Sequence, residues 1–181
     1  MIYPIVAFGD PVLKKEAAEL PKGEDIKQLA SDMFDTMYNA KGVGLAAPQI
    51  GKSIRMFVVD AEGFDEEECK GFKKVFLNPE IIEEGDTEWA FEEGCLSIPG
   101  IREEVWRPET IVVQYFDENW KQHKETLTGI NARVFQHEFD HIDGILFTDH
   151  LSGLKKRLNK NRLLGISKGR VDVDYRMKFP K

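Results

Sequence analysis

The stretch Gln136-His137-Glu138-Phe139-Asp140-His141 places two histidines four residues apart within a segment whose apolar pattern predicts a helix. Residues at this spacing lie one turn apart on the same helix face, where two imidazoles can bind one metal ion. The glutamate beside the first histidine can reach a water molecule on that ion. The motif indicates metal-assisted hydrolysis of an amide-like bond. Its structural alternative is a pair of buried, hydrogen-bonded histidines with Glu138 in a salt bridge.

The helix is predicted to begin near Gly129 and to end near Ile142. Ile130, Val134 and Phe135 precede the histidines and give the helix an apolar surface, so we expect it to be buried. A catalytic metal site of this kind has three protein ligands and one open position. The sequence around the helix must therefore supply a third ligand.

A metalloprotease of the metzincin type would take its third ligand from a histidine further along the chain. Gly144 matches the glycine of that extended pattern, but the ligand position is occupied by Phe147, and His150 comes three residues too late. Phenylalanine cannot bind a metal ion. The metzincin interpretation therefore fails at its third ligand.

Cys95 is the stronger candidate for the third ligand. It lies in Glu93-Gly94-Cys95-Leu96-Ser97-Ile98-Pro99-Gly100, a tight segment between two predicted strands. A cysteine bound to a divalent ion is a thiolate, and one sulfur with two imidazole nitrogens fills three corners of a tetrahedron. The alternative is that Cys95 is a small buried hydrophobic residue.

The rest of the chain predicts an α+β fold, with mainly antiparallel sheets around the motif helix. Helical periodicity also appears in residues 25–39 and 152–164, and residues 170–179 alternate like a short final edge strand. Residues 61–71 form an acidic segment that predicts a surface loop. Strand patterns occur at 54–59, 75–77, 80–83, 87–91, 103–106, 111–116 and 120–127.

Length and composition predict one cytoplasmic domain over residues 1–181. The formal charge of −7 argues against a general nucleic-acid binder, and no specific DNA partner is expected. We expect neither a signal peptide nor a membrane span. The two cysteines, Cys69 and Cys95, do not form a disulfide framework, which favours a reducing compartment. A bacterial cytoplasm is expected, and an organelle after removal of a targeting segment stays open.

Three motifs, in this order, resemble those of the peptide deformylase family. Residues 42–49 read Gly-Val-Gly-Leu-Ala-Ala-Pro-Gln, residues 93–97 read Glu-Gly-Cys-Leu-Ser, and residues 136–141 read Gln-His-Glu-Phe-Asp-His. Gly9-Asp10-Pro11-Val12-Leu13 also suits the family, and the resemblance extends to about Ser152. Ile142 departs from the leucine that many members carry at that position.

The resemblance implies removal of the N-formyl group from the initiator methionine of nascent polypeptides, with release of formate. It assigns Cys95, His137 and His141 to a divalent metal, usually Fe(II), with Zn, Ni or Co able to replace it. Glu138 becomes the acid–base catalyst. The side-chain amide of Gln49 and the backbone N–H of Leu96 become donors to the oxyanion. Without the resemblance, Gln49 is equally a polar residue at a loop end.

The resemblance also implies substrate contacts from Gly42, Val43, Gly44 and Gly94, where small residues permit close approach of a peptide. The helix face before the histidines would line a methionine pocket with Val134 and the stem of Arg133. The alternative is that Val134 is plain core and Arg133 is solvated. Asp140 is expected to form an ion pair, and Arg102 either supports the cysteine segment or lies on the surface.

Other residues have simpler interpretations. Cys69 is expected to be a surface or half-buried thiol, and His123 and His150 to be structural or solvated. The basic helix near residues 155–162 is expected to be solvated or to make a weak, salt-sensitive ribosome contact. Two other function classes remain: a different metallopeptidase, or a zinc module closed by a fourth ligand, which would unfold without its metal.

Overall fold

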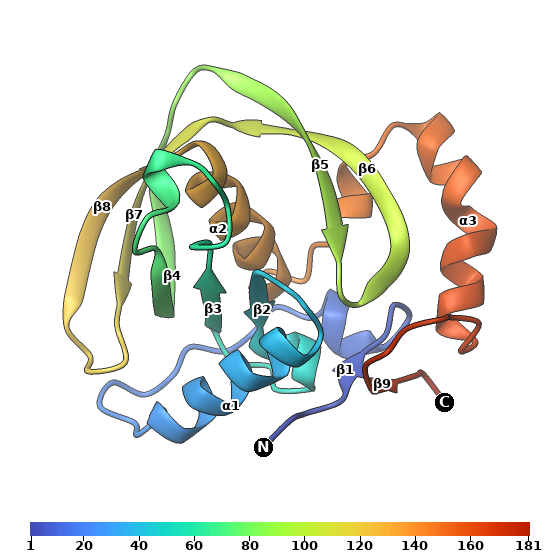
Figure 1. Cartoon of the computed structure of the whole chain (residues 1–181), viewed down its shortest axis with the longest axis horizontal. Coiled ribbons are helices and arrows are strands. Elements are labelled where there is room, and N and C mark those ends of the chain that lie inside the picture. The colour runs from blue at the N-terminus through green and yellow to red at the C-terminus, as the bar shows by residue number, and fades with distance from the viewer.

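The computed structural model describes residues 1–181, and its centre is a five-stranded antiparallel sheet (Figure 1). The spatial order of the strands is β2-β3-β4-β7-β8. A short turn joins β7 to β8, whereas the connections from β2 to β3 and from β3 to β4 each contain a 3₁₀ helix. Between β4 and β7 the chain leaves the sheet to form a separate hairpin. The strands are β2 (Gly44–Ala46), β3 (Met56–Asp60), β4 (Lys73–Glu84), β7 (Thr110–Phe116) and β8 (Gln122–Thr128).

Helix α2 (Gly129–Ile142) carries the paired histidines and has the predicted bounds. Figure 1 shows it enclosed between the curved sheet and the β5–β6 hairpin. Phe135 on its sheet-facing side meets Phe57 and Phe76 edge-on, with ring centroids 5.2 and 5.0 Å apart. Aromatic pairs in this arrangement add stability beyond the area that they bury. The contacts fix the helix on the sheet and turn its histidines toward the hairpin.

The separate hairpin consists of β5 (Glu88–Cys95) and β6 (Ile98–Pro108). Its register shifts between Glu93 and Cys95, and Cys95 then pairs with Ile98 across the turn. A bulge of this kind re-aims the side chains that follow it. It brings the cysteine to the tip of the hairpin, next to α2.

The remaining helices cover the outside of the molecule. Helix α1 (Lys27–Asn39) buries Met33 and Met37 against the sheet, and α3 (Gly153–Ser167) packs on β6. The final strand β9 (Met177–Lys178) pairs in parallel with β1 (Ile5–Val6). Four short 3₁₀ helices complete the fold, at Pro11–Lys14, Ala47–Ile50, Glu67–Cys69 and Phe147–His150. The predicted α+β class, C-terminal helix and short final strand are confirmed.

Two sequence-based expectations need correction. The two strands predicted at 75–77 and 80–83 form a single strand, β4. The backbone is irregular at Asn78, where φ is +46° and the pairing register with β7 shifts, but the strand continues past it. Cys69 is fully buried rather than half-exposed. Cys69 belongs to the apolar cluster that includes Phe135 of α2, and Glu68 accepts the N–H of Ile130 at the start of α2, so the acidic loop is docked on the helix. None of the helices is both long and apolar enough to cross a bilayer.

Candidate active site

Cys95, His137 and His141 meet at the junction of the hairpin tip and α2. One ligand atom from each lies within 4.8 Å of the other two. The sulfur of Cys95 is 3.3 Å from Nε2 of His141, and both histidines are buried. Burial lowers the pKa of His141 well below its usual value, so its imidazole is neutral, the form that binds a metal. The structure thus assembles the three side chains that the sequence predicted would share a metal.

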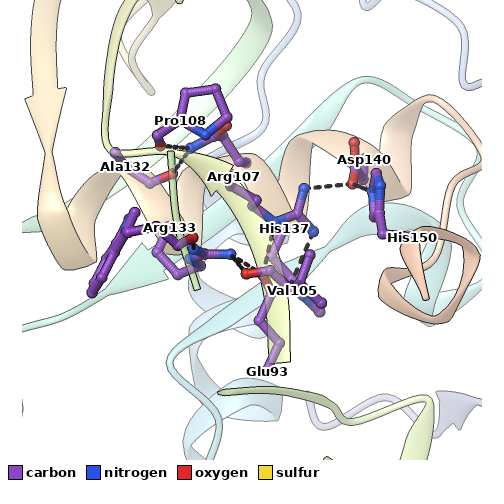
Figure 2. A network of polar contacts seen from close by, with 11 residues as sticks. Glu93, Val105, Arg107, Pro108, Ala132, Arg133, His137, Asp140 and His150 are labelled. Atoms are coloured by element: carbon purple, nitrogen blue, oxygen red, sulfur yellow. Dashed lines mark hydrogen bonds and ion pairs between the residues drawn. The ribbon is translucent and has the colours of Figure 1, made fainter. Parts of the chain in front are cut away.

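A buried carboxylate orients the first histidine. Nδ1 of His137 donates to Glu93 at 2.8 Å, which leaves Nε2 of His137 available as a ligand atom. Arg107 donates two hydrogen bonds to the same carboxylate, at 2.7 and 3.0 Å, and Arg133 donates one at 2.6 Å (Figure 2). Burial opposes ionisation of Glu93, but these donors outweigh it and hold the pKa of Glu93 well below its usual range. Glu93 therefore stays charged in the interior.

The network continues from Arg107 toward the surface. Arg107 also donates to Asp140 at 2.8 Å, and Nε2 of His150 lies 2.7 Å from the same carboxylate (Figure 2). Asp140 is thus an ion-pair partner, as predicted, and His150 is a structural residue at the edge of the network. Glu93 and Arg107 had no predicted role of their own. The only signal was Glu93 in the Glu-Gly-Cys motif, because nothing in the sequence shows that the side chain of Arg107 reaches the Glu93 carboxylate.

Glu138 is buried beside the histidines and lacks a full set of partners. Its Oε2 has no hydrogen-bond donor, which contradicts the alternative that places Glu138 in a salt bridge. Burial raises the pKa of Glu138 to about 7. A Cβ added at Gly44 would lie 2.6 Å from Oε1 of Glu138, so glycine is required for this close approach. A carboxyl group with a pKa near neutrality suits proton transfer in either direction.

Gln49 and Leu96 adjoin Cys95. The side-chain nitrogen of Gln49 is 3.1 Å from Oγ of Ser97 and 3.5 Å from Sγ of Cys95, and its oxygen accepts the N–H of Ala46. These contacts fix which end of the amide faces the cysteine. Leu96, next to the cysteine in the hairpin turn, is half-buried. Gln49 is therefore a fixed donor beside the cluster and not a free loop-end residue.

A cleft of about 510 Å³ opens in front of these groups. It contains all the residues that the sequence analysis proposed as substrate contacts, namely Gly42, Val43, Gly44, Gly94, Arg133 and Val134. Arg133 is only 2% exposed, so the solvated alternative is wrong. Val134 belongs to both the cleft and the largest apolar core. Arg102 lines the cleft but is largely exposed, and it pairs with Glu92 at 2.8 Å.

Residues 2–157 match the family model described as polypeptide deformylase. The chain belongs to the peptide deformylase family. It is 58% identical to the peptide deformylase of Cytophaga hutchinsonii, with 99% of this chain and 98% of the relative aligned. It is 56% identical to that of Christiangramia forsetii, over 99% of this chain and 97% of the relative. A peptide deformylase is a hydrolase that removes the N-formyl group from nascent peptides.

Solved deformylase structures share the fold. The enzyme from Plasmodium falciparum superposes with a TM-score of 0.83 at 38% identity, covering 91% of this chain and 95% of that one. The Legionella pneumophila deformylase gives a TM-score of 0.82 at 41% identity, covering 94% and 98%. At these identities and coverages, the family assignment extends to the whole α+β architecture.

The residues of this deformylase fit a divalent metal ion. One cysteine sulfur and two imidazoles converge, and such donors suit Fe, Zn, Ni and Co ions. The contact between His137 and Glu93 fixes the ring as a ligating histidine needs. Glu138 stands beside these donors with an unpartnered oxygen. No fourth protein donor joins the group, so the arrangement leaves an open position.

Sequence reasoning missed several lining residues of the deformylase cleft, among them Phe64, Phe91, Val173 and Tyr175. Phe64 lies in the acidic loop, and Val173 and Tyr175 lie in the C-terminal segment. Isolated apolar residues in such segments give no signal of their own. The alternation at the end of the chain showed one apolar face, but not that this face meets the cleft.

Proposed function

We propose that this deformylase acts on the N-formyl group of N-terminal formyl-methionine and releases formate. The observation that carries the proposal is Glu138, a buried carboxyl with an unpartnered oxygen, set between the Cys95–His137–His141 cluster and the cleft. A structural metal site has no use for such a group. An amide hydrolase needs one, because a proton must move from water to the leaving nitrogen.

The metal would be held by Cys95, His137 and His141, and we propose Fe(II) as the native ion, with Zn, Ni or Co able to replace it. When bound, the ion supplies Lewis acidity and lowers the pKa of water. Imidazole and thiolate donors alone do not select one of these ions. Fe(II) and a thiolate are both oxidisable, so the iron form is expected to lose activity faster in air than under argon.

Different residues of the site carry out proton transfer and charge stabilisation during hydrolysis. Glu138 takes a proton from the attacking water and delivers it to the methionine nitrogen as the formyl C–N bond breaks. The products are formate and a free amine. The Gln49 amide and the Leu96 N–H stabilise the negative oxygen of the tetrahedral intermediate, and each such donor contributes about 3 kcal/mol. Val134 and the stem of Arg133 offer apolar surface to the methionine side chain.

The direct test is formate release from N-formyl-Met-Ala-Ser by anaerobically purified protein whose metal content is measured in the same sample. We expect release that is absent with the N-acetyl analogue. Glu138→Gln should keep the metal and lose at least about 100-fold in kcat. No release from fully metallated protein would refute deformylation. Cleavage of unformylated peptides would instead favour the peptidase interpretation.

We also propose a weak contact between α3 and ribosomal RNA, because nascent chains emerge from ribosomes. Lys156, Arg157 and Lys160 on this helix are exposed, whereas Lys155 pairs with Glu103 at 3.2 Å. Exposed cations bind phosphates in a salt-dependent way. Reversing the three free charges should weaken ribosome co-sedimentation at low salt, and reversing three exposed lysines elsewhere should not. Equal binding by both variants would refute the contact.

We further propose that residues 1–181 work as one catalytic domain in the bacterial cytoplasm. The site draws its residues from the hairpin, from α2 and from the C-terminal segment, so no part of the chain forms it alone. The proposed substrate is a formylated nascent chain, which bacteria make in that compartment. Fractionation of the source cells with antibody detection would test the location.

A further inference from the structure

The C-terminal segment after α3 lies beyond residue 157, where the match to the family model ends. Its residues alternate in exposure: Val171, Val173, Tyr175 and Met177 are half-buried, and the residues between them are exposed. Only Met177–Lys178 pair with another strand, β1, which anchors the end of the segment. Contacts other than strand pairing therefore bury the inward-facing side chains of Val171, Val173 and Tyr175.

Two residues of this inward face line the substrate cleft, Val173 and Tyr175. The hydroxyl of Tyr175 donates to the backbone carbonyl of Leu96 at 2.7 Å. Burial raises the pKa of Tyr175, so the phenol stays protonated and remains a donor. On the outward face, Asp174 reaches Lys41 at 3.1 Å, but both side chains are largely exposed and this pair contributes little.

The tip of the β5–β6 hairpin is held by residues that are distant in sequence. The carbonyl of Ser97 accepts the N–H of Phe8 at 2.9 Å, and the carbonyl of Leu96 accepts the Tyr175 hydroxyl. Because peptide units are planar, the N–H and the carbonyl of Leu96 are separated by only two rotatable bonds. A clamp on the carbonyl therefore restricts the direction of the Leu96 N–H.

We propose that the segment Val171–Lys178 is a wall of the substrate cleft and that Tyr175 is a positioning residue that aims the Leu96 N–H. The proposal rests on the proposed function of Leu96 as an oxyanion donor. Tyr175 touches the backbone of the donor residue and acts on the reaction through it. Val173, in the same wall, contributes apolar surface to the bound peptide.

Tyr175→Phe removes the hydroxyl and keeps the ring. We expect kcat for N-formyl-Met-Ala-Ser to fall about fivefold, the effect of one misaligned hydrogen bond, with KM changed less than twofold. Tyr115→Phe is the matched control, because Tyr115 is a buried tyrosine with a single hydroxyl contact, to Glu125, away from the cleft. An unchanged kcat in Tyr175→Phe would overturn the positioning role.

Amide hydrogen exchange separates this inference from the proposed function. In the zinc-loaded protein, Tyr175→Phe should raise the exchange rate of the Leu96 amide about fivefold, and Tyr115→Phe should leave it unchanged. Faster exchange with an unchanged kcat would show that the clamp exists but that Leu96 is not an oxyanion donor. Unchanged exchange would refute the clamp whatever the activity.

The wall itself is tested with Val173→Ser. Loss of apolar surface at the cleft should raise KM for N-formyl-Met-Ala-Ser about threefold, with kcat within twofold. Val112→Ser, at a half-buried valine on β7 outside the cleft, is the control for general destabilisation. A KM equal to that of the wild type, or an equal rise in the control, would show that the segment is not part of the substrate site.

Discussion

At the scale of single residues, the site depends on close contact between the Glu138 side chain and the backbone at Gly44. Glu138 carries its carboxyl group against the backbone at Gly44, with room for a hydrogen atom and none for a methyl group. The acid–base role proposed for Glu138 needs its unpartnered oxygen to stay aimed at the metal cluster. Gly44, in the first motif, is therefore needed for the position of the Glu138 side chain, almost a hundred residues later in the chain.

Gly44→Ala should lower kcat about 100-fold while leaving the fold intact. The added Cβ would lie 2.6 Å from Oε1 of Glu138, so the carboxyl group must move, and misplacement of a catalytic group by about 1 Å costs this much. Steady-state kinetics and far-UV circular dichroism test the prediction. Gly63→Ala is the control, because a Cβ there meets nothing within 4 Å. Comparable activity in both variants would contradict the steric argument.

At the scale of elements, a buried cluster of charged side chains joins the β5–β6 hairpin to α2. Glu93 on β5 receives Arg107 from β6 and both Arg133 and His137 from α2, all with little solvent contact. Removing one member of a buried ion cluster leaves the other members charged and without solvent. The resulting loss of stability is larger than the net stabilisation that the ion pairs contribute. The position of the helix relative to the hairpin tip therefore depends on this carboxylate.

Glu93→Gln should lower the free energy of unfolding by about 3 kcal/mol, because it leaves the buried Arg133 guanidinium without an anion and leaves Arg107 with Asp140 as its only anion. Urea denaturation at pH 7 measures the change. Glu92→Gln is a matched control on the neighbouring residue, whose partner Arg102 is largely exposed, and it should cost less than about 0.5 kcal/mol. Equal losses in the two variants would show that the buried network does not join the elements.

The β7–β8 hairpin carries its own charged contact in its turn. Asp117 accepts the N–H groups of Asn119 and Lys121 at 2.8 and 3.0 Å, and its other oxygen lies 2.7 Å from His123. Burial opposes ionisation of Asp117, but these donors hold its pKa below the usual value. The ionised carboxylate therefore stabilises the fold above the unfolded pKa near 4, and this contribution is lost as pH falls through the lower folded pKa.

Asp117→Asn should lower the free energy of unfolding by about 1 kcal/mol at pH 7. The difference from wild type should shrink below about pH 4 and vanish once the native carboxyl is protonated, since the two side chains then carry the same charge. Urea melts at a series of pH values measure this. If the difference between Asp117→Asn and wild type grew as the pH fell, the pKa of Asp117 would not be lowered in the folded protein.

At the scale of the whole molecule, the fold rests on three apolar clusters of 17, 13 and 10 buried residues. The first lies between the sheet and α2, the second lies under α1, and the third joins the hairpin to α3 and the chain ends. The metal donors are not members of these clusters, so the apolar core does not depend on a bound metal ion. The fold should therefore persist without metal.

Chelation should abolish activity and leave the circular dichroism spectrum intact. A metal-linked stabilisation of about 3 kcal/mol would lower Tm by about 10 °C in a domain of this size. Restoring Zn or Fe(II) anaerobically should recover both activity and Tm. Loss of secondary structure on chelation would instead support the structural-zinc interpretation.

Features that depend on local spacing can be predicted from the amino-acid sequence alone. The bounds of α2 follow from its apolar pattern, and the pairing of His137 with His141 follows from the helical repeat. Alternation at 170–179 gave the C-terminal segment an inward face, and the three motifs together gave the family. Each of these is carried by residues close in the chain or by the chemistry of a short motif.

Folding alone determines which distant residues meet. It buried Arg133 and Cys69, turned Glu93 toward Arg107 and His137, and placed Tyr175 on the carbonyl of Leu96. A charged residue is buried only where partners compensate it, and those partners lie on other elements. The strand alternation likewise showed an apolar face without showing what covers it. These contacts join residues that are brought together by packing of the hairpin, α2 and the chain end, and no local sequence pattern encodes that packing.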